Sequence, residues 1–215
     1  MIKDKPFPTR LFKIGATIFN WYMRGKFNKL IINQIEIKPN HSYLLMCNHF
    51  SFWDGPLVFY LIRRAIDKRQ PLTSIKIMVM KKQMVMNKWL KYVGCFSISP
   101  GIGAIEKSLN YAAESLNEPG NLLLMYPQGN LESSHIREIK FKEGIASIIP
   151  KIKGDCQLIW CSTLTEYFES IKPTVYFDML DCGTNHDFNF ERLKEKVNQH
   201  HKNAIKKQFR FTDES

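Results

Sequence analysis

The stretch YLLMCNHFSFWDGPLVFYLIRRAI, residues 43–66, contains a strand, a polar loop and a helix in succession. Residues Tyr43–Cys47 are apolar, and the run is short enough for a buried strand. Pro56 begins a second apolar run that reaches Ile66, and proline is favoured in the first turn of a helix. The segment between the two runs, Asn48–Asp54, is therefore predicted to be a loop at the end of a strand. A strand followed by a loop and a helix is the repeating unit of an α/β fold.

The rest of the chain continues this alternation. Further strands are predicted at Ile31–Ile37, Ile75–Met80, Cys95–Ser99, Leu122–Tyr126, Gln157–Cys161 and Thr174–Asp178, and further helices at Lys81–Tyr92, Ala104–Leu116, Gly144–Ile152 and Phe188–Gln208. The periodicity of the first of these helices places Met84, Val85, Lys88 and Trp89 on one face. We therefore predict an α/β fold: a single domain with a mixed, mostly parallel sheet flanked by helices.

The composition narrows the classes of partner. The 215 residues carry a net charge of +11, which favours anionic partners such as nucleic acid, anionic lipid or a phosphorylated substrate, or else serves only solubility. The sequence contains no nucleic-acid-binding motif, so no nucleic acid is expected. Five cysteines occur without C-x-x-C spacing, which argues against zinc-ribbon and thioredoxin-type sites and indicates a reducing environment.

The N-terminal part of the chain is predicted to be a basic amphipathic helix from Pro8 to about Phe27. Its apolar stripe consists of Leu11, Phe12, Gly15, Ile18, Phe19 and Tyr22. Such a helix beds into lipid headgroups or packs its stripe on the domain. We divide the chain into a membrane-associating segment, residues 1–30, and a domain of residues 31–215 that carries the site. The sequence has no apolar run long enough to span a bilayer and no secretory leader, so we expect peripheral association with the cytoplasmic face of the membrane.

The loop after the strand holds the densest chemistry. His49 and Asp54 are five positions apart, and on one helix they would point about 140° away from each other. Because Pro56 starts the helix, the preceding loop is free to curl His49 back over Asp54. A neutral imidazole takes a proton from a hydroxyl, and a carboxylate on its other nitrogen orients the ring. Alternatively, Asp54 caps the helix, and Asn48 and His49 are turn residues.

The sequence lacks the G-x-S-x-G motif of a serine nucleophile. A His-Asp pair without a protein nucleophile suggests that a substrate hydroxyl attacks an acyl thioester directly.

Asn48-His49-x-x-x-x-Asp54 resembles the first conserved block of the glycerolipid and lysophospholipid acyltransferase family. Further blocks follow in the same order. The segment Gly94–Ser99 resembles the second block, Tyr126-Pro127-Gln128-Gly129 resembles the third block, Phe-Pro-Glu-Gly, and Phe141-Lys142-Glu143-Gly144 resembles the Phe-Lys-x-Gly segment that follows it. By this resemblance the chain is similar to bacterial 1-acylglycerol-3-phosphate acyltransferases.

The resemblance implies transfer of a fatty acyl group from acyl carrier protein or acyl-CoA to a hydroxyl of a lysolipid or other lipid at the membrane surface. It implies His49 as general base, Asp54 as the residue that orients it, and no metal or other cofactor. We assign substrate binding to Asn48, Ser51, Gln128, Gly129 and Lys142. Gly129 is either a turn that needs a positive φ or a place where a backbone N–H approaches the reacting carbonyl. Lys142 binds a donor or acceptor phosphate, or is a solvated surface lysine.

Other residues near these blocks have two interpretations. Glu132 and His135 belong to the site or to a polar loop. Phe50, Phe52 and Trp53 line an acyl channel or belong to the core.

The chain departs from the family at positions that concern the acceptor. The second block usually ends in Arg, where this chain has Pro100, and the third continues Thr-Arg, where this chain has Asn130-Leu131. A guanidinium suits phosphate oxygens, so a phosphomonoester acceptor is in doubt unless other cations replace these arginines. The candidates for replacement are Arg137, Lys140, Lys142 and Lys81. The fourth block, Leu158–Cys161, also lacks its usual proline.

Two other functions remain open at this point: a non-catalytic basic membrane-binding module and an acyl-thioester hydrolase in which water replaces the acceptor.

Overall fold

The computed structural model describes residues 1–6, 9–99 and 101–208, and a seven-stranded sheet forms its centre. The strands are β1 (Leu30–Asn33), β2 (Ser42–Cys47), β3 (Ser74–Met80), β4 (Cys95–Ile98), β5 (Asn121–Met125), β6 (Cys156–Glu166) and β7 (Thr174–Thr184). They lie in the order β1-β7-β6-β2-β5-β3-β4, and every neighbouring pair is parallel except β6 and β7. The predicted α/β fold with a mixed, mostly parallel sheet in a single domain is confirmed.

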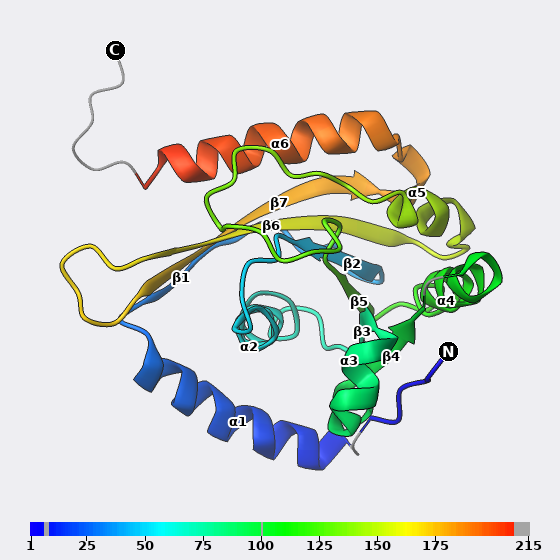
Figure 1. The fold of residues 1–215 in the computed structure, drawn as a ribbon, viewed down its shortest axis with the longest axis horizontal. Helices are drawn as coiled ribbons and strands as arrows, with labels where there is room; N and C mark the ends of the chain where they lie inside the picture. The colour runs from blue at the N-terminus through cyan, green and yellow to red at the C-terminus, as the bar shows by residue number, and fades with distance from the viewer. Residues whose placement is uncertain (7–8, 100, 209–215) are drawn as a thin grey trace.

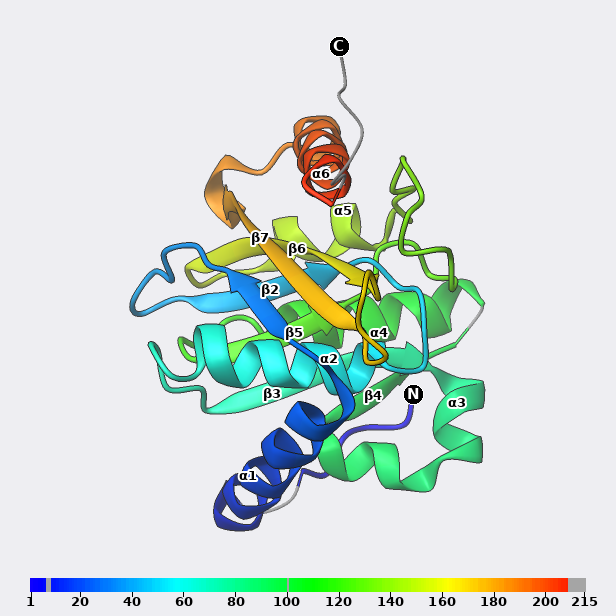
Figure 2. The same ribbon diagram turned by 90° about the vertical axis from the view of Figure 1, so that its left-hand side faces the viewer.

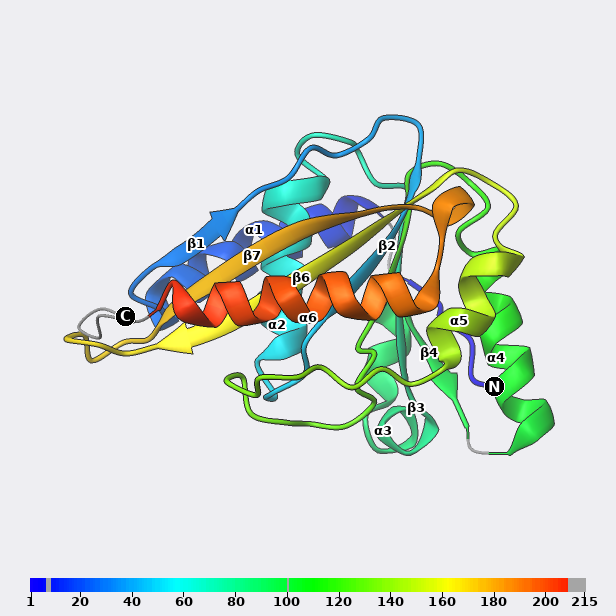
Figure 3. The same cartoon turned by 90° about the horizontal axis from the view of Figure 1, so that it is seen from above.

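Helices cover both faces of the sheet. Figure 1 shows α6 (Phe190–Lys206) above the sheet, with α2 (Asp54–Leu61) below it and α1 (Thr9–Lys26) lower still. Side chains of α4 (Ile102–Glu114), α5 (Gly144–Ile148) and α6 share one hydrophobic cluster, and side chains of α1 and α2 share the other. In the view from above, α6 runs along β6 and β7 (Figure 3).

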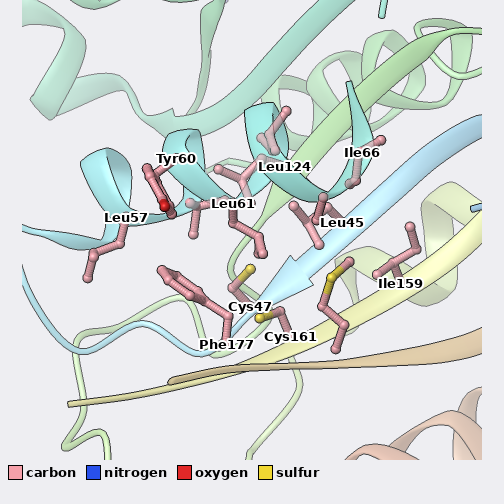
Figure 4. Packing of buried hydrophobic residues seen from close by; sticks show 14 of the residues in the cluster. Leu45, Cys47, Leu57, Tyr60, Leu61, Ile66, Leu124, Ile159, Cys161 and Phe177 are labelled. Carbon is pink, nitrogen blue, oxygen red and sulfur yellow. The ribbon is translucent and has the colours of Figure 1, made fainter. Parts of the chain in front are cut away.

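The central strand β2 is buried on both faces. Its alternate residues Leu44 and Met46 belong to the cluster below α4 to α6, whereas Tyr43, Leu45 and Cys47 belong to the cluster shared with α2. Figure 4 shows α2 side chains such as Leu57 and Leu61 packed toward Leu45, Cys47 and Phe177. Because each buried aliphatic side chain contributes about 1.5–3 kcal/mol, this packing holds the strand rigidly at the centre of the sheet.

The first predicted strand, Ile31–Ile37, is shorter than expected. β1 ends at Asn33, and the chain then leaves the ladder. The side-chain amide of Gln157 takes the place of a neighbouring strand, because it accepts from the N–H of Lys38 at 3.0 Å and donates to the carbonyl of Glu36 at 3.0 Å. The strands β6 and β7 are longer than predicted because they continue past the parallel strands as an antiparallel pair.

The predicted helix Lys81–Tyr92 is broken. α3 (Lys81–Met86) ends before Asn87, whose φ of −122° and ψ of 75° are not helical, and a 3-10 helix, Lys88–Val93, follows. As a result, Met84 is buried while Val85, Lys88 and Trp89 are exposed, so the four residues do not share a face. Gly94 ends this segment at φ +89°, where a Cβ atom would lie 2.1 Å from the Ile75 carbonyl oxygen.

The helix α1 packs part of the predicted stripe on the domain and leaves part of it exposed. Phe19 of the stripe packs its ring edge-to-face on Phe59 at 5.3 Å, whereas Ile18 and Tyr22 of the stripe are exposed. Met23 and Phe27, outside the predicted stripe, are also buried. The predicted helix start at Pro8 and the side chains of Leu11 and Phe12 lie outside the described residues. Within the described part of the chain, no helix is long and apolar enough to cross a membrane.

Candidate active site

The candidate residues lie where two neighbouring strands end. β2 and β5 are parallel neighbours, and the loops that follow them carry His49 and Gln128. The carboxyl ends of parallel strands meet at the same edge of a sheet, where α/β proteins commonly build their sites. Sheet order therefore brings together two sequence blocks that are 79 positions apart.

The two residues at the centre of the site are in contact. The Nδ1 atom of His49 lies 2.5 Å from the Oδ2 atom of Asp54. A carboxylate only accepts, so Nδ1 carries a proton, and in the neutral imidazole Nε2 is then the nitrogen with the free lone pair. The Asp54 side chain is 2% exposed, whereas that of His49 is 25% exposed, so part of the imidazole is open to solvent.

The turn from His49 to Asp54 closes on one carboxylate. Oδ2 of Asp54 also accepts from the N–H groups of Phe50 at 2.7 Å and Ser51 at 3.0 Å, and the Ser51 hydroxyl donates to Oδ1 at 3.3 Å. The Trp53 N–H donates to the Ser51 hydroxyl at 3.0 Å. Asp54 is the first residue of α2, and its carboxylate accepts from groups that precede the helix. The alternative interpretation of Asp54 as a helix cap is therefore wrong, because no side chain caps this helix.

The loop after β5, residues 126–143, holds the main chain of His49 from the other side. The Gln128 side chain accepts from the His49 N–H at 2.8 Å, and the Glu132 N–H donates to the His49 carbonyl at 2.8 Å. Gln128 is buried and also donates to the Glu132 carboxylate. In this structure Gln128 and Glu132 therefore position His49, and Glu132 belongs to the site and not only to a polar loop.

Tyr126 of the third block covers the histidine ring. The two rings stack with centroids 4.4 Å apart and an interplanar angle of 23°. The Tyr126 hydroxyl is buried without a hydrogen-bond partner among the described residues, and burial raises its pKa well above the ordinary range. It thus stays a neutral phenol beside the dyad. The sequence identifies Tyr126 only as part of a motif, and the fold shows that its ring packs on the His49 ring.

The polar side chains of the predicted substrate-binding residues Asn48 and Ser51 already form hydrogen bonds within the protein. Asn48 is buried, and its amide both donates to the Thr163 carbonyl at 2.9 Å and accepts from the Thr163 N–H at 2.7 Å. It links the end of β2 to β6, so it supports the turn, and its assignment to substrate binding stays a prediction. The Ser51 hydroxyl is engaged with Asp54 and Trp53. No motif or periodicity in the sequence predicts that the backbone of Thr163 bonds the Asn48 amide.

Gly129 fits the turn interpretation. Its φ is +70°, and its N–H donates to the Tyr126 carbonyl at 3.1 Å, so this N–H is not free to bind an oxyanion here. The stem of Lys142 lies over it, because a Cβ atom on Gly129 would meet Lys142 Cγ at 3.3 Å. Lys142 itself is exposed.

The cations that the sequence offered as replacements for the missing arginines are exposed. Arg137 and Lys140 lie in the 126–143 loop, and Lys81 begins α3, which follows the neighbouring strand β3. Pro100 lies outside the described residues.

The aromatic residues of the first block divide between core and surface. Phe50 and Trp53 pack against the core cluster that contains α2, whereas Phe52 is 87% exposed. Trp53 also meets Phe27, just after α1, edge-to-face with ring centroids 5.5 Å apart.

The described residues contain no candidate set of metal ligands. Among them, no group of three or more His, Cys, Asp or Glu side chains is placed to hold a metal ion. The cysteine closest in sequence to the dyad is Cys47, a free thiol whose pKa burial raises well above its usual range. Such a thiol is a packing residue and a poor nucleophile.

Comparisons with known proteins show the family of the chain and a similar fold. The model of a family described as Acyltransferase matches residues 29–162. The fold is similar to the crystal structure of the 1-acyl-sn-glycerophosphate (LPA) acyltransferase PlsC from Thermotoga maritima. That match has a TM-score of 0.58 and 15% sequence identity, and it covers 92% of this chain and 81% of that chain. A search of curated proteins finds no match.

Proposed function

The chain belongs to the acyltransferase family, and on this premise we propose that it transfers a fatty acyl group from a thioester donor to a hydroxyl of a lipid acceptor. The observation that carries the proposal is the 2.5 Å contact between His49 Nδ1 and Asp54 Oδ2, just after the carboxyl end of β2. The donor is acyl carrier protein or acyl-CoA, since both present the acyl group as a thioester.

The dyad accounts for the proton transfers of this reaction. Asp54 holds the proton on Nδ1, so Nε2 takes the proton of the acceptor hydroxyl as its oxygen attacks the thioester carbonyl. The tetrahedral intermediate then collapses, the carbon–sulfur bond breaks, and the thiolate receives the proton from Nε2. The products are an ester and a free thiol, and His49 returns to its starting state.

The surroundings of the dyad support direct transfer without an acyl-enzyme. The Ser51 hydroxyl is bonded to the Asp54 carboxylate, and the Cys47 thiol is buried with a raised pKa. Neither group is prepared to attack a thioester. A hydroxyl brought by the acceptor is then the nucleophile.

The activity is tested with labelled acyl-CoA and labelled acyl carrier protein against lipid acceptors with and without a phosphomonoester. We expect a labelled lipid from the wild type and a loss of at least about 1,000-fold in His49→Ala. The matched control is His186→Ala, since His186 is exposed and pairs with Asp155 before β6, away from the dyad.

Each other outcome of this assay points to a named alternative. Release of free fatty acid that is independent of acceptor indicates a thioester hydrolase. Identical traces for the wild type and His49→Ala indicate the non-catalytic membrane-binding module. An acyl group trapped on the protein after acid quenching contradicts direct transfer.

We further propose that the protein docks on an anionic membrane through α1 and the segment of residues 80–93. Exposed apolar side chains support this docking: Ile18, Trp21 and Tyr22 on α1, and Val85, Met86 and Trp89 in the second segment. Segment 80–93 also carries four lysines and no acidic residue. Figures 1 and 2 both place α1 and α3 on the lower side of the molecule, opposite α6. Apolar side chains flanked by lysines suit the boundary between anionic headgroups and acyl chains.

Docking is tested by sedimentation with vesicles of zwitterionic lipid alone or with added anionic lipid. We expect the double variant Trp21→Ser/Met86→Ser to lose most binding to the anionic vesicles, with an unchanged midpoint of thermal unfolding. Ile105→Ser, which changes an exposed apolar residue of α4, is the control. Unchanged binding of the double variant contradicts the assignment of this surface.

We propose that the membrane face on which the protein docks is the cytoplasmic one, because acyl thioesters are made in the cytoplasm.

A further inference from the structure

The loop of residues 126–143 is held by a helix outside the matched family region. This loop bonds both main-chain groups of His49, yet it contains no helix or strand of its own. The hydrogen bond from the Lys142 N–H to the Pro127 carbonyl, 2.8 Å long, joins the two ends of the loop. Its middle is tied to α6, whose residues 190–206 follow the 29–162 segment that the family model matches.

The first tie is His201. This side chain is fully buried on α6, and its Nε2 atom lies 2.9 Å from the Ile136 carbonyl oxygen, so Nε2 carries the proton. Its Nδ1 atom therefore accepts from the Ser162 hydroxyl at 2.9 Å. The Ser162 oxygen in turn accepts from the Trp160 indole N–H at 2.8 Å. Every polar atom in this chain of bonds has one defined role, which fixes the imidazole and, with it, the Ile136 carbonyl.

The second tie is Asn198, three positions earlier on α6. Its Oδ1 atom accepts from the Ile139 N–H at 2.6 Å, and its Nδ2 group donates to the Ile139 carbonyl at 3.2 Å. The side-chain amide thus pairs with the backbone of the loop as a neighbouring strand would. Ile139 itself is buried in the core, so the loop is fixed by both packing and hydrogen bonds.

We propose that Asn198 and His201 are positioning residues for acyl transfer. They hold the loop, the loop holds the main chain of His49 through Gln128 and Glu132, and the imidazole consequently points its free Nε2 toward the acceptor hydroxyl. This inference rests on the proposed acyltransferase activity. Because a displacement of about 1 Å in a reacting group costs up to about 100-fold in rate, loss of the ties lowers kcat.

The test measures kcat and the donor KM per folded molecule for the wild type, Asn198→Leu and His201→Phe, well below their unfolding midpoints. We expect kcat to fall about 10- to 100-fold in both variants, with the donor KM within about threefold of the wild type. His201→Gln has an amide donor for Ile136 and an acceptor for Ser162, and we expect it to restore kcat to within about threefold of the wild type. Asn203→Ala is the matched control, since it removes an exposed α6 asparagine whose side chain accepts from Gln199 on the same helix.

A second measurement covers the case in which a variant folds poorly. Amide hydrogen exchange in the milder variant Asn198→Ser should rise in residues 130–140 and at His49, while β2 and β6 keep their protection. Wild-type kcat in Asn198→Leu and His201→Phe overturns the inference, as does an equal loss in Asn203→Ala. If the wild type itself transfers no acyl group, the proposed function fails and the exchange result alone still decides whether α6 holds the loop.

Discussion

The two loops that meet at His49 are built in opposite ways. The turn His49–Asp54 closes on itself, because the Asp54 carboxylate accepts from the ring of His49 and from the N–H groups of Phe50 and Ser51 within five positions. The 126–143 loop instead relies on distant partners, since Asn198 and His201 of α6 hold its middle. The first arrangement depends mainly on local sequence and the second on the packed fold.

Variants of the two loops should therefore have different effects on activity and on stability. On the proposed mechanism, a variant in the turn changes the groups that transfer the proton, so its main effect should be on activity. A variant in the long loop or its supports changes where those groups stand, so it should affect rate and stability together. The following predictions test this division, from the largest effect to the smallest.

Replacement of Asp54 by asparagine should have the largest effect on activity. An amide in place of the carboxylate carries a donor as well as an acceptor, so the imidazole loses its fixed tautomer and its orientation. We expect kcat to fall about 1,000-fold or more, measured as acyl transfer to the best acceptor. Ser51→Ala, which removes the 3.3 Å bond to Oδ1, should lose less than about tenfold and is the control. Equal losses in the two variants would show that the turn as a whole, and not the carboxylate, governs the rate.

Acid should weaken the support of the long loop through His201. Burial lowers the pKa of this imidazole from 6.5 to about 4, and the nearby His200 and His135 act in the same direction. Between these two pH values the unfolded chain binds a proton that the folded chain does not. The free energy of unfolding therefore keeps its full value, as far as His201 is concerned, above pH 6.5. It declines as the pH falls from 6.5 toward 4, because protons bind the unfolded chain first.

The measurement is urea unfolding at about pH 7 and about pH 4.5. The wild type should lose about 2 kcal/mol more than His201→Gln on acidification, since glutamine does not titrate. The same acid loss in both proteins would contradict the assignment to His201.

Gln128 connects the two loops, and its removal should reduce both rate and stability moderately. Gln128→Leu leaves the His49 N–H without its acceptor, which corresponds to about 1–3 kcal/mol. We expect kcat to fall at least about tenfold, accompanied by a lower unfolding midpoint. Gln199→Leu, at an exposed position of α6, should change neither quantity. A Gln128→Leu enzyme with wild-type kcat would mean that the loop does not place His49.

Gly129→Ala should have the smallest effect. The residue sits at φ +70°, which costs an L-residue about 1 kcal/mol, and the new Cβ would press on Lys142 Cγ at 3.3 Å. Urea unfolding should show a loss of about 1 kcal/mol. Gly103→Ala in α4 has open space around it and should gain stability instead, because alanine favours the helix. A gain at both positions would contradict the strained turn at Gly129.

The sequence alone was sufficient for the α/β class, for most strand positions and for the His49–Asp54 pair. The reasons are local: apolar runs mark buried strands, Pro56 marks the start of a helix, and the turn between them carries its own hydrogen-bond acceptors. The sequence did not predict the break at Asn87 or the full lengths of β6 and β7, and it did not separate the packed from the exposed side chains of α1. Each of them depends on which surface the segment meets.

Only the tertiary structure decided how the two loops are tied to the rest of the fold. Asn48 bonds to Thr163, 115 positions away, and Ile139 bonds to Asn198, 59 positions away. No periodicity or motif at either residue signals such a pair, because a hydrogen bond between distant segments is specified by the packing that brings them together. The sequence therefore determined the His49–Asp54 pair through local hydrogen bonds, and the packing of α6 and β6 determined which distant segments bond to Asn48 and to the 126–143 loop.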